Sequence, residues 1–582
     1  AHLRSRVPDD PAHWIAPRNS RADREHTQET IPVDGFLGQF GKYQLITISL
    51  LAFPSLICAF MAGDYIFTAG NLPTRCAVPE CDGPKPEYSP DWITNAVPPT
   101  ASGFDNCNRY VNATNVISPD GLCPASLFDR DIIVPCDSYV YERTNTMVYD
   151  FNINCQEWLR ALPGTLNSAG GMVALLLAGF ISDRLGRRVS IVFFSFNVAL
   201  IGVIRAFSVN FAMYTALQFM QTAIGGGAFS ASYIMAAEVV GPRYRVRTSA
   251  TISTMFALGQ VVLGVLAFAV RPWRTLTLVL YVPVFLILSY YWILSESFRW
   301  LLSKNKQEEG KATLEYASRL NGKQISAKNM EFLMTAIHNQ MQENKQVNEE
   351  NLLLRVIKSP VLLRRCCTTP ILWMTTVFIY YGLSINSVNL SGNMYLNYIA
   401  IAAIEIPGFW TAVLVLDRVG RRVTLFCGFM ICGLCCLAFA FVPKNMYILS
   451  LILYLVGKFC IGFVMTSVYL YTAELYPTRY RHSFLGFSSM LGRIGSVIAP
   501  LTPALMVYWS GIPSIMFAST AIISALLCLT QPETLGQRVP DTIEDAERLV
   551  HWQNVIKDLE MSYKDEKVIM QIPMFISTIV QV

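Results

Sequence analysis

Asp183-Arg184-Leu185-Gly186-Arg187-Arg188 occurs a second time in this chain as Asp417-Arg418-Val419-Gly420-Arg421-Arg422, 234 residues later. Each copy follows one long apolar stretch and precedes another. The central glycine permits a tight turn. The repeated stretch therefore predicts two equivalent hairpins of apolar helices, each with its charges gathered at the turn.

Two further acidic signatures recur at nearly the same spacing. Glu238, followed by Arg243-Tyr244-Arg245, returns 236 residues later as Glu474, followed by Arg479-Tyr480-Arg481. Glu296 returns 237 residues later as Glu533. Any one of these clusters could simply flank and stop a helix. Three matches at one spacing instead indicate parallel repeats related by an axis along the membrane normal.

Composition sets the solvent of this fold. The chain has 582 residues, of which 53% are hydrophobic and 15% charged. Apolar stretches of about 20 residues, enough to cross a hydrocarbon core of about 30 Å, recur along it. We predict an all-α membrane protein with twelve transmembrane helices in two six-helix pseudo-repeats. The predicted spans are 44–67, 162–182, 189–208, 211–236, 249–270, 274–294, 368–388, 394–416, 423–442, 446–472, 484–508 and 512–530.

The basic residues indicate the orientation. They cluster after the second, fourth and eighth predicted spans, and positively charged loops face the cytoplasm. Both termini are then cytoplasmic, and the polar first 43 residues leave the first span to act as the insertion signal. The predicted organisation is a cytoplasmic segment (1–43), a first half (44–298), a cytoplasmic linker with short amphipathic helices (299–365), a second half (366–530) and a cytoplasmic tail (531–582).

A polar loop, 68–158, separates the first two spans and is rich in cysteine. Its six cysteines predict three disulfides and an extracellular location, with fifteen pairings possible. A metal-binding loop is the weaker alternative, because no close Cys or His pairs occur. The sequon Asn112-Ala113-Thr114 predicts glycosylation at Asn112. The six are Cys76, Cys81, Cys107, Cys123, Cys136 and Cys155.

Four charged residues inside predicted spans are candidate substrate ligands, because an ionisable group in a bilayer is costly unless it is paired or faces water. Glu405 and Arg493 lie deep in their spans. Asp64 and Lys458 lie nearer to helix ends, where an interfacial position is the alternative.

Four aromatic residues complete the candidate substrate site. Phe229 and Tyr233 lie four residues apart on one helix face, and Tyr380 and Tyr381 lie midway along the seventh span. Aromatic rings in a dry cavity attract an ammonium group by roughly 2 kcal/mol. Packing against lipid or neighbouring helices is the alternative.

The repeated charges are candidate gating residues. Carboxylates at the cytoplasmic helix ends can pair with arginines across the seam between the halves, and we expect such pairs to form in the outward-facing state and to break in the inward-facing one. The set comprises Asp183, Arg184, Arg187, Arg188, Glu238, Arg243, Arg245, Glu296, Arg299, Asp417, Arg418, Arg421, Arg422, Glu474, Arg479, Arg481 and Glu533.

These signatures, with Gly179-Phe180-Ile181-Ser182 before Asp183, resemble the major facilitator superfamily, and more closely solute carrier family 22, the organic cation, anion and zwitterion transporters. One departure is Ser295 and Phe298, where the family pattern usually has prolines. The finer resemblance covers nearly the whole chain and rests on the six-cysteine loop, on Glu296-Ser297-Phe298-Arg299-Trp300-Leu301-Leu302, on Ala473-Glu474-Leu475-Tyr476-Pro477-Thr478-Arg479, on Pro532-Glu533-Thr534-Leu535-Gly536 and on Pro540-Asp541-Thr542-Ile543-Glu544-Asp545-Ala546-Glu547.

The resemblance also bears on the substrate. Members that carry simple cations tend to have an acid in place of Arg493, whereas anion and carnitine-type transporters tend to have arginine. Anion transporters tend to add a lysine where this chain has Phe409, and Glu405 lies in the same span. A pocket with both Arg493 and Glu405 suits a small zwitterion such as carnitine or β-alanine, with organic cations second.

The expected protein is thus a monomeric plasma-membrane transporter that works by alternating access. Its expected partners are a small organic cation or zwitterion and the lipid bilayer, without nucleic acid, metal or cofactor. Coupling to sodium or protons stays open. The alternatives are an organic anion transporter of the same family and, from another class, a receptor or channel. The sequence contains no nucleophile elbow, phosphate-binding glycine loop or metal-ligand cluster that would indicate an enzyme.

Overall fold

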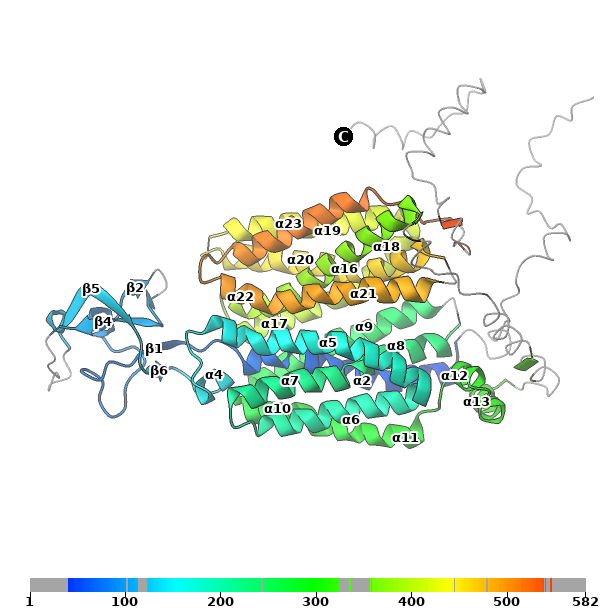
Figure 1. Ribbon diagram of the computed structural model, residues 1–582, viewed down its shortest axis with the longest axis horizontal. Helices are drawn as coiled ribbons and strands as arrows, with labels where there is room; N and C mark the ends of the chain where they lie inside the picture. Colours follow the sequence, from blue (N-terminus) through cyan, green and yellow to red (C-terminus); the bar gives the residue numbers. More distant parts are fainter. Residues whose placement is uncertain are drawn as a thin grey trace, which may run out of the picture.

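The computed structural model describes residues 40–537, except 101–102, 114–122, 242–243, 324–329, 331–333, 336–355, 357, 444 and 478–479, together with 540 and 545–546. The predicted terminal segments lie almost entirely outside these residues. In the described part, long helices run side by side, and a strand-containing segment stands beyond one end of the bundle (Figure 1).

The first half of the bundle is built from helices that precede residue 300. They are α2 (Lys42–Thr68), α5 (Glu157–Leu185), α6 (Arg187–Ala206), α7 (Phe211–Gly225), α8 (Gly227–Val239), α9 (Arg245–Ala269), α10 (Trp273–Tyr281), the 3-10 helix η5 (Pro283–Ser289) and α11 (Tyr290–Ile293).

The second half is built from helices that follow residue 359. They are α16 (Pro360–Asn386), η6 (Ser387–Asn389), α17 (Met394–Ala403), α18 (Glu405–Val419), α19 (Arg421–Phe441), α20 (Tyr447–Leu475), α21 (Arg481–Ile498), η7 (Ala499–Leu501), α22 (Thr502–Leu505) and α23 (Ile512–Cys528). Figure 1 shows this half lying along the first, with α5 against α21 and α9 against α17 and α18 at the seam.

Ten helices among the described residues are long and apolar enough to cross a membrane, and each coincides with a predicted span. The span predicted at 512–530 corresponds to α23, an apolar helix of 17 residues. The span predicted at 211–236 is two helices, α7 and α8, which meet at Gly226. The adjacent Gly227 lets α6 pack closely, because a Cβ there would lie 2.6 Å from the Phe194 ring.

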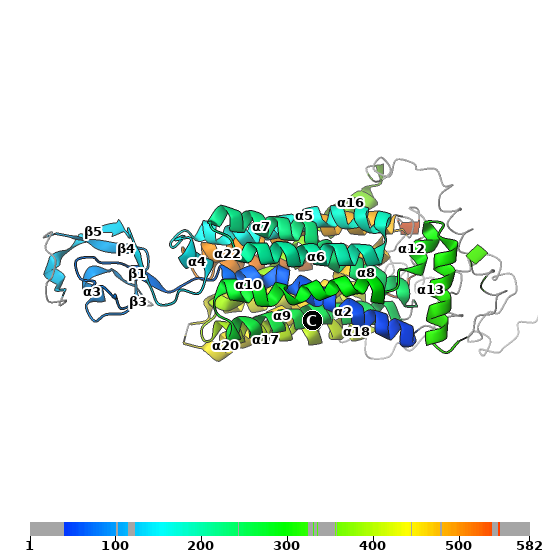
Figure 2. The ribbon, with the colours of Figure 1, turned by 90° about the horizontal axis from the view of Figure 1, so that it is seen from below.

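The linker helices and the cysteine-rich segment lie at opposite ends of the bundle, as the predicted topology requires (Figures 1 and 2). The linker contributes α12 (Phe298–Ser303) and α13 (Gln307–Leu320), and α13 crosses the end of the bundle (Figure 2). Helix α13 is amphipathic, since Gly310, Leu314 and Ala317 are buried on one face.

The cysteine-rich segment contains the three predicted disulfides, Cys76–Cys136, Cys81–Cys123 and Cys107–Cys155. They connect short antiparallel pairs: β1 (Thr74–Cys76) with β6 (Tyr139–Tyr141), β2 (Pro99–Thr100) with β3 (Gly103–Phe104), and β4 (Asn108–Asn112) with β5 (Phe128–Pro135). Helices α3 (Ile93–Ala96) and α4 (Met147–Asp150) and the 3-10 turn η3 (Ala125–Leu127) complete the segment.

A buried arginine organises the start of this segment. Arg75 is fully buried and donates from its two terminal nitrogens to both carboxylate oxygens of Asp82, at 2.8 and 2.6 Å. Its guanidinium also lies 5.4 Å from the centre of the Trp92 ring. Asn112 lies on β4, but Thr114 of its sequon is outside the described residues, so glycosylation there stays a prediction.

Candidate transport site and charge clusters

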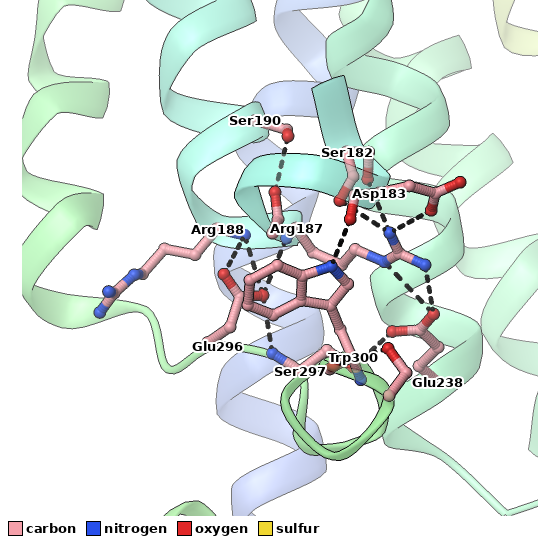
Figure 3. Close-up of polar contacts among 11 residues, drawn as sticks. Ser182, Asp183, Arg187, Arg188, Ser190, Glu238, Glu296, Ser297 and Trp300 are labelled. Atoms are coloured by element: carbon pink, nitrogen blue, oxygen red, sulfur yellow. Dashed lines mark hydrogen bonds and ion pairs between the residues drawn. The ribbon is translucent and has the colours of Figure 1, made fainter. Parts of the chain in front are cut away.

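The first repeated stretch forms a turn closed by a buried carboxylate (Figure 3). Gly186 joins α5 to α6 at φ +100°. Glu296 accepts hydrogen bonds from the backbone N–H of Arg187 at 2.8 Å, of Arg188 at 3.2 Å and of Ser297 at 2.8 Å. The carboxylate thus satisfies the first amides of α6, which have no partner within the helix.

The Arg187 side chain links three helices around this turn (Figure 3). Its guanidinium lies 2.8 Å from Asp183 Oδ1 on α5 and 3.1 Å from Glu238 Oε1 on α8. Glu238 in turn accepts a hydrogen bond from the Ser297 hydroxyl. The cluster therefore joins α5, α6, α8 and the segment that leads into α12.

The second repeated stretch reproduces this arrangement. Gly420 also has φ +100°, and Glu533 accepts from the backbone N–H of Arg421 at 2.8 Å. The Arg421 guanidinium lies 3.0 Å from both Asp417 and Glu474. Thr534 takes the place of Ser297, since its hydroxyl donates to Glu474 at 2.6 Å. The structure thus extends the repeat to a hydroxyl residue that the sequence comparison did not single out.

The expected pairing across the seam is not what the structure shows. The ion pairs of Arg187 and Arg421 lie within one half each, and no cross-seam ion pair of the repeated charges is found among the described residues. Arg184, Arg245 and Arg418 are exposed.

The other members of the set occupy varied places. Arg188, Arg422 and Arg481 are half-buried. The Arg299 guanidinium lies 5.7 Å from the Phe298 ring centre, and Arg243 and Arg479 are outside the described residues. The clusters therefore first of all hold each half together as a unit.

The environment of Glu296 has two opposing effects. Burial raises the pKa of the Glu296 carboxyl above its usual value, and the backbone N–H groups of Ser297, Arg188 and Arg187 counteract part of that rise. The hydrogen bonds thus offset much of the cost of burying this carboxylate.

Asp64 lies in a buried ion pair inside the first half. Its side chain is fully buried on α2 and forms an ion pair with Arg205, also fully buried, in the last turn of α6. Tyr281 on α10 donates to Asp64 Oδ2 at 2.7 Å, and Gln218 on α7 donates to Oδ1 at 3.2 Å. The carboxylate therefore connects four helices of one half. Its predicted role in substrate binding stays a prediction.

Glu405 and Lys458 form a second buried ion pair, this time in the other half. Glu405 begins α18, and its Oε1 lies 2.9 Å from Lys458 Nζ on α20, with both side chains fully buried. Tyr380 donates its hydroxyl to Glu405 Oε2. Gln260 on α9 of the first half donates to the same oxygen at 3.0 Å, so this network spans the seam.

Arg493 differs from these pairs. It is half-buried on α21, and among the described residues no hydrogen bond or ion pair to its guanidinium is found. The preceding Gly492 packs on Trp373 of α16, and Tyr469 of α20 lies within electrostatic reach of Arg493.

A row of aromatic rings runs from this region across the seam. Trp373 and Tyr469 of the second half have ring centres 4.3 Å apart. Tyr469 lies 6.4 Å from Tyr233 of α8, which stacks with Phe229 at 6.1 Å. The predicted residues Phe229 and Tyr233 thus lie at the seam together with two rings that the sequence interpretation missed. Tyr381 is half-buried next to Tyr380.

A small cavity lies elsewhere along the seam, at the end of the bundle that carries the disulfide segment. Its volume is about 50 Å³, and α2 and α5 face α16, η7 and α22 across it. Glu157 and Arg160, an ion pair at the start of α5, line it. None of the predicted substrate ligands lines this cavity, so it is separate from the Arg493 region.

The sequence interpretation missed the partners of the intramembrane charges. Arg205 lies inside the predicted span 189–208, where the cost of an ionisable group in a bilayer should have marked it. Gln260 and Gln218 lie in the middle of apolar stretches and carry a weaker signal of the same kind. Trp373 and Tyr469 carried no distinguishing signal, because aromatic residues are common throughout these spans.

Comparison with known proteins agrees with this architecture. The model of the Major Facilitator Superfamily matches residues 150–500 and 396–579. The "Organic cation transporter protein" of Drosophila melanogaster is 32% identical over 519 residues, which cover 88% of this chain and 93% of that protein. "Organic cation/carnitine transporter 2" of Mus musculus is 30% identical, covering 90% and 95%. "Solute carrier family 22 member 3" of Rattus norvegicus is 29% identical, covering 88% and 94%.

Among solved structures, the proton:xylose symporter XylE shares the fold, with a TM-score of 0.57 and 14% sequence identity over 85% of this chain and 98% of that one. The apolar helices and the two matched turn clusters define a membrane transporter rather than an enzyme. The chain belongs to the major facilitator superfamily and, within it, to solute carrier family 22.

Proposed function

We propose that this protein transports small organic zwitterions, such as carnitine or β-alanine, across the plasma membrane by alternating access. Arg493 would bind the carboxylate of the substrate, and the aromatic rings at the seam would bind its ammonium group. The named relatives include organic cation and carnitine transporters, which supports a substrate of this chemical class.

The observation that carries the proposal is the unpartnered guanidinium of Arg493 among the described residues. Apart from Arg274 at the first residue of its span, the charged residues within the predicted spans are Asp64, Arg205, Glu405, Lys458 and Arg493. The first four neutralise one another in two buried pairs. Arg493 therefore leaves one positive charge, and a guanidinium can hold a carboxylate through two hydrogen bonds.

The ammonium end of the substrate has a matching environment. Tyr469 is within electrostatic reach of Arg493, and its ring continues the row toward Tyr233 and Phe229 on α8. Such rings attract an ammonium or trimethylammonium group through their faces. A zwitterion could thus contact Arg493 in one half and α8 in the other.

The repeated clusters fit the movement that alternating access requires. Arg187 and Arg421 tie together helices of one half each, so the halves can rock against each other as units. We propose that the turn charges control this movement, with the disulfide segment extracellular and both termini cytoplasmic.

Organic anions are the second candidate substrate class. The Glu405–Lys458 pair favours them, because a neutralised Glu405 would not repel a substrate that carries only a carboxylate. A zwitterion and an anion would both need Arg493, so only a direct comparison separates them.

The proposal predicts that Arg493→Ala lowers zwitterion uptake at least about tenfold, because a charge-assisted hydrogen bond contributes roughly 1.5–3 kcal/mol. Uptake of labelled carnitine, β-alanine, benzoate and tetraethylammonium should be measured in cells that express wild type, Arg493→Ala or Arg493→Lys, with surface expression quantified. Arg493→Lys keeps the charge but not the paired hydrogen bonds, and we expect an intermediate loss.

Three outcomes would contradict the proposal. Unchanged zwitterion uptake in Arg493→Ala would exclude the carboxylate site. Uptake of benzoate but not of carnitine or β-alanine would favour an anion transporter. An ionic current without saturable uptake would indicate a channel.

A further inference from the structure

We propose that Lys458 is a tethered cation that fills the site formed by Glu405 and Tyr380 and so excludes simple organic cations from it. Lys458 would then be a specificity-determining residue that acts against substrates with an ammonium group and no carboxylate. This inference rests on the transport function proposed above and states which substrates that function excludes.

The ammonium of Lys458 occupies the position that an organic cation would need. Its Nζ lies 2.9 Å from Glu405 Oε1 and 3.8 Å from the centre of the Tyr380 ring. It also donates to the Tyr380 carbonyl oxygen and to Ser384 Oγ, both at 2.7 Å. A carboxylate, an aromatic face and two further acceptors form a complete site for a primary ammonium group.

This site lies where transport chemistry is expected. Glu405 Oε2 accepts from Gln260, which belongs to the first half, so the occupied site bridges the two halves. If Lys458 were absent, a cation bound to Glu405 would touch residues on both sides of the seam. The same place would then serve alternating access for a cation.

A tethered ammonium competes strongly with a free one. Lys458 is fixed on α20, and both it and Glu405 are fully buried. Attachment to the same chain gives a group an effective concentration of millimolar or higher without any loss of translational freedom on binding. A free cation at micromolar concentration therefore does not displace it.

The other buried acid offers no alternative site. Asp64 is paired with Arg205 and also accepts hydrogen bonds from Tyr281 and Gln218. Both acids inside the predicted spans are thus neutralised by basic residues of the chain itself. A substrate ammonium is left with aromatic faces, and Arg493 supplies the charge that selects for a carboxylate.

Removal of the tethered cation should create a binding site for its free analogue. In purified Lys458→Ala, n-butylammonium, which matches the lysine side chain in length and charge, should raise the thermal unfolding midpoint with saturation. Wild type and Lys458→Arg should show no such shift. Uptake of labelled n-butylammonium by cells should rise at least about tenfold in Lys458→Ala relative to wild type.

Glu405→Gln with Lys458→Ala is the matched control. This variant keeps the vacated space but lacks the carboxylate, so n-butylammonium should not stabilise it. Stabilisation of this control to the same extent as Lys458→Ala would overturn the proposal. A folded Lys458→Ala protein that binds n-butylammonium no better than wild type would overturn it as well.

A second measurement does not depend on the folding of Lys458→Ala. Tetraethylammonium binding should be compared between purified wild type and Glu405→Gln with Lys458→Met, in which the pair is replaced by neutral side chains of similar size. The proposal predicts equal affinity, because Glu405 is not available to cations in wild type. A tenfold loss in the neutral variant would show that Glu405 binds cations despite Lys458. These readouts use cation binding alone, so failure of the zwitterion function would appear separately, in the Arg493 experiment.

Discussion

Arg205→Leu is expected to lower the free energy of unfolding by about 3–5 kcal/mol and to remove most of the protein from the cell surface. The substitution leaves the Asp64 carboxylate buried without its counter-charge, with only Tyr281 and Gln218 as hydrogen-bond donors. The thermal unfolding midpoint of the purified protein in detergent and its surface expression measure this loss.

The matched control is Arg205→Leu combined with Asp64→Asn, which removes both charges and keeps an acceptor for Tyr281. We expect this double variant to regain most of the lost stability. It also tests the predicted role of Asp64, because a double variant that folds and transports zwitterions normally would show that the carboxylate is structural. Equal instability of the single and double variants would contradict the view that the unpaired charge is the cause.

Gly186→Ala and Gly420→Ala are each expected to destabilise their half by about 2–5 kcal/mol and to abolish transport. Both glycines have φ +100° with an extended ψ, a conformation that is essentially restricted to glycine. A Cβ at Gly420 would lie 2.7 Å from Glu533 Oε2, and one at Gly186 would press on the Glu296 carboxylate. The added methyl group would therefore displace the acid that holds the next helix.

Gly179→Ala on α5 is the control for this pair, because nothing lies within 4 Å of a Cβ there and alanine favours a helix. We expect Gly179→Ala to keep wild-type surface expression and uptake. Normal uptake by Gly186→Ala at normal surface expression would show that the turn tolerates a side chain and that the carboxylate closure is dispensable.

The parts of the fold that depend on local sequence could be predicted. The spans follow from runs of apolar residues as long as the bilayer is thick, and the turns at Gly186 and Gly420 follow from a motif that occurs twice. The six cysteines indicated three disulfides, although their pairing depends on the folded segment and was left open. The break at Gly226 was missed, because the apolar pattern continues through it and only the packing of α6 accounts for the glycines.

The partners of the buried charges could not be predicted in the same way. Asp64 and Arg205 are 141 residues apart, and no local pattern relates them. Glu405 looked available for substrate because the sequence does not show that Lys458, from another helix, reaches it. The expected pairing across the seam failed for the same reason: the compatible partners of Arg187 and Arg421 were already present within each half.

The claim that Arg493 selects for a carboxylate is tested most directly by combining one change in the protein with one change in the substrate. Binding of β-alanine and of its amide, which lacks the carboxylate, should be measured by competition in wild type and Arg493→Ala at equal surface expression. We predict that wild type prefers β-alanine over the amide by at least about tenfold and that Arg493→Ala shows no preference. The same preference in both proteins would contradict this account.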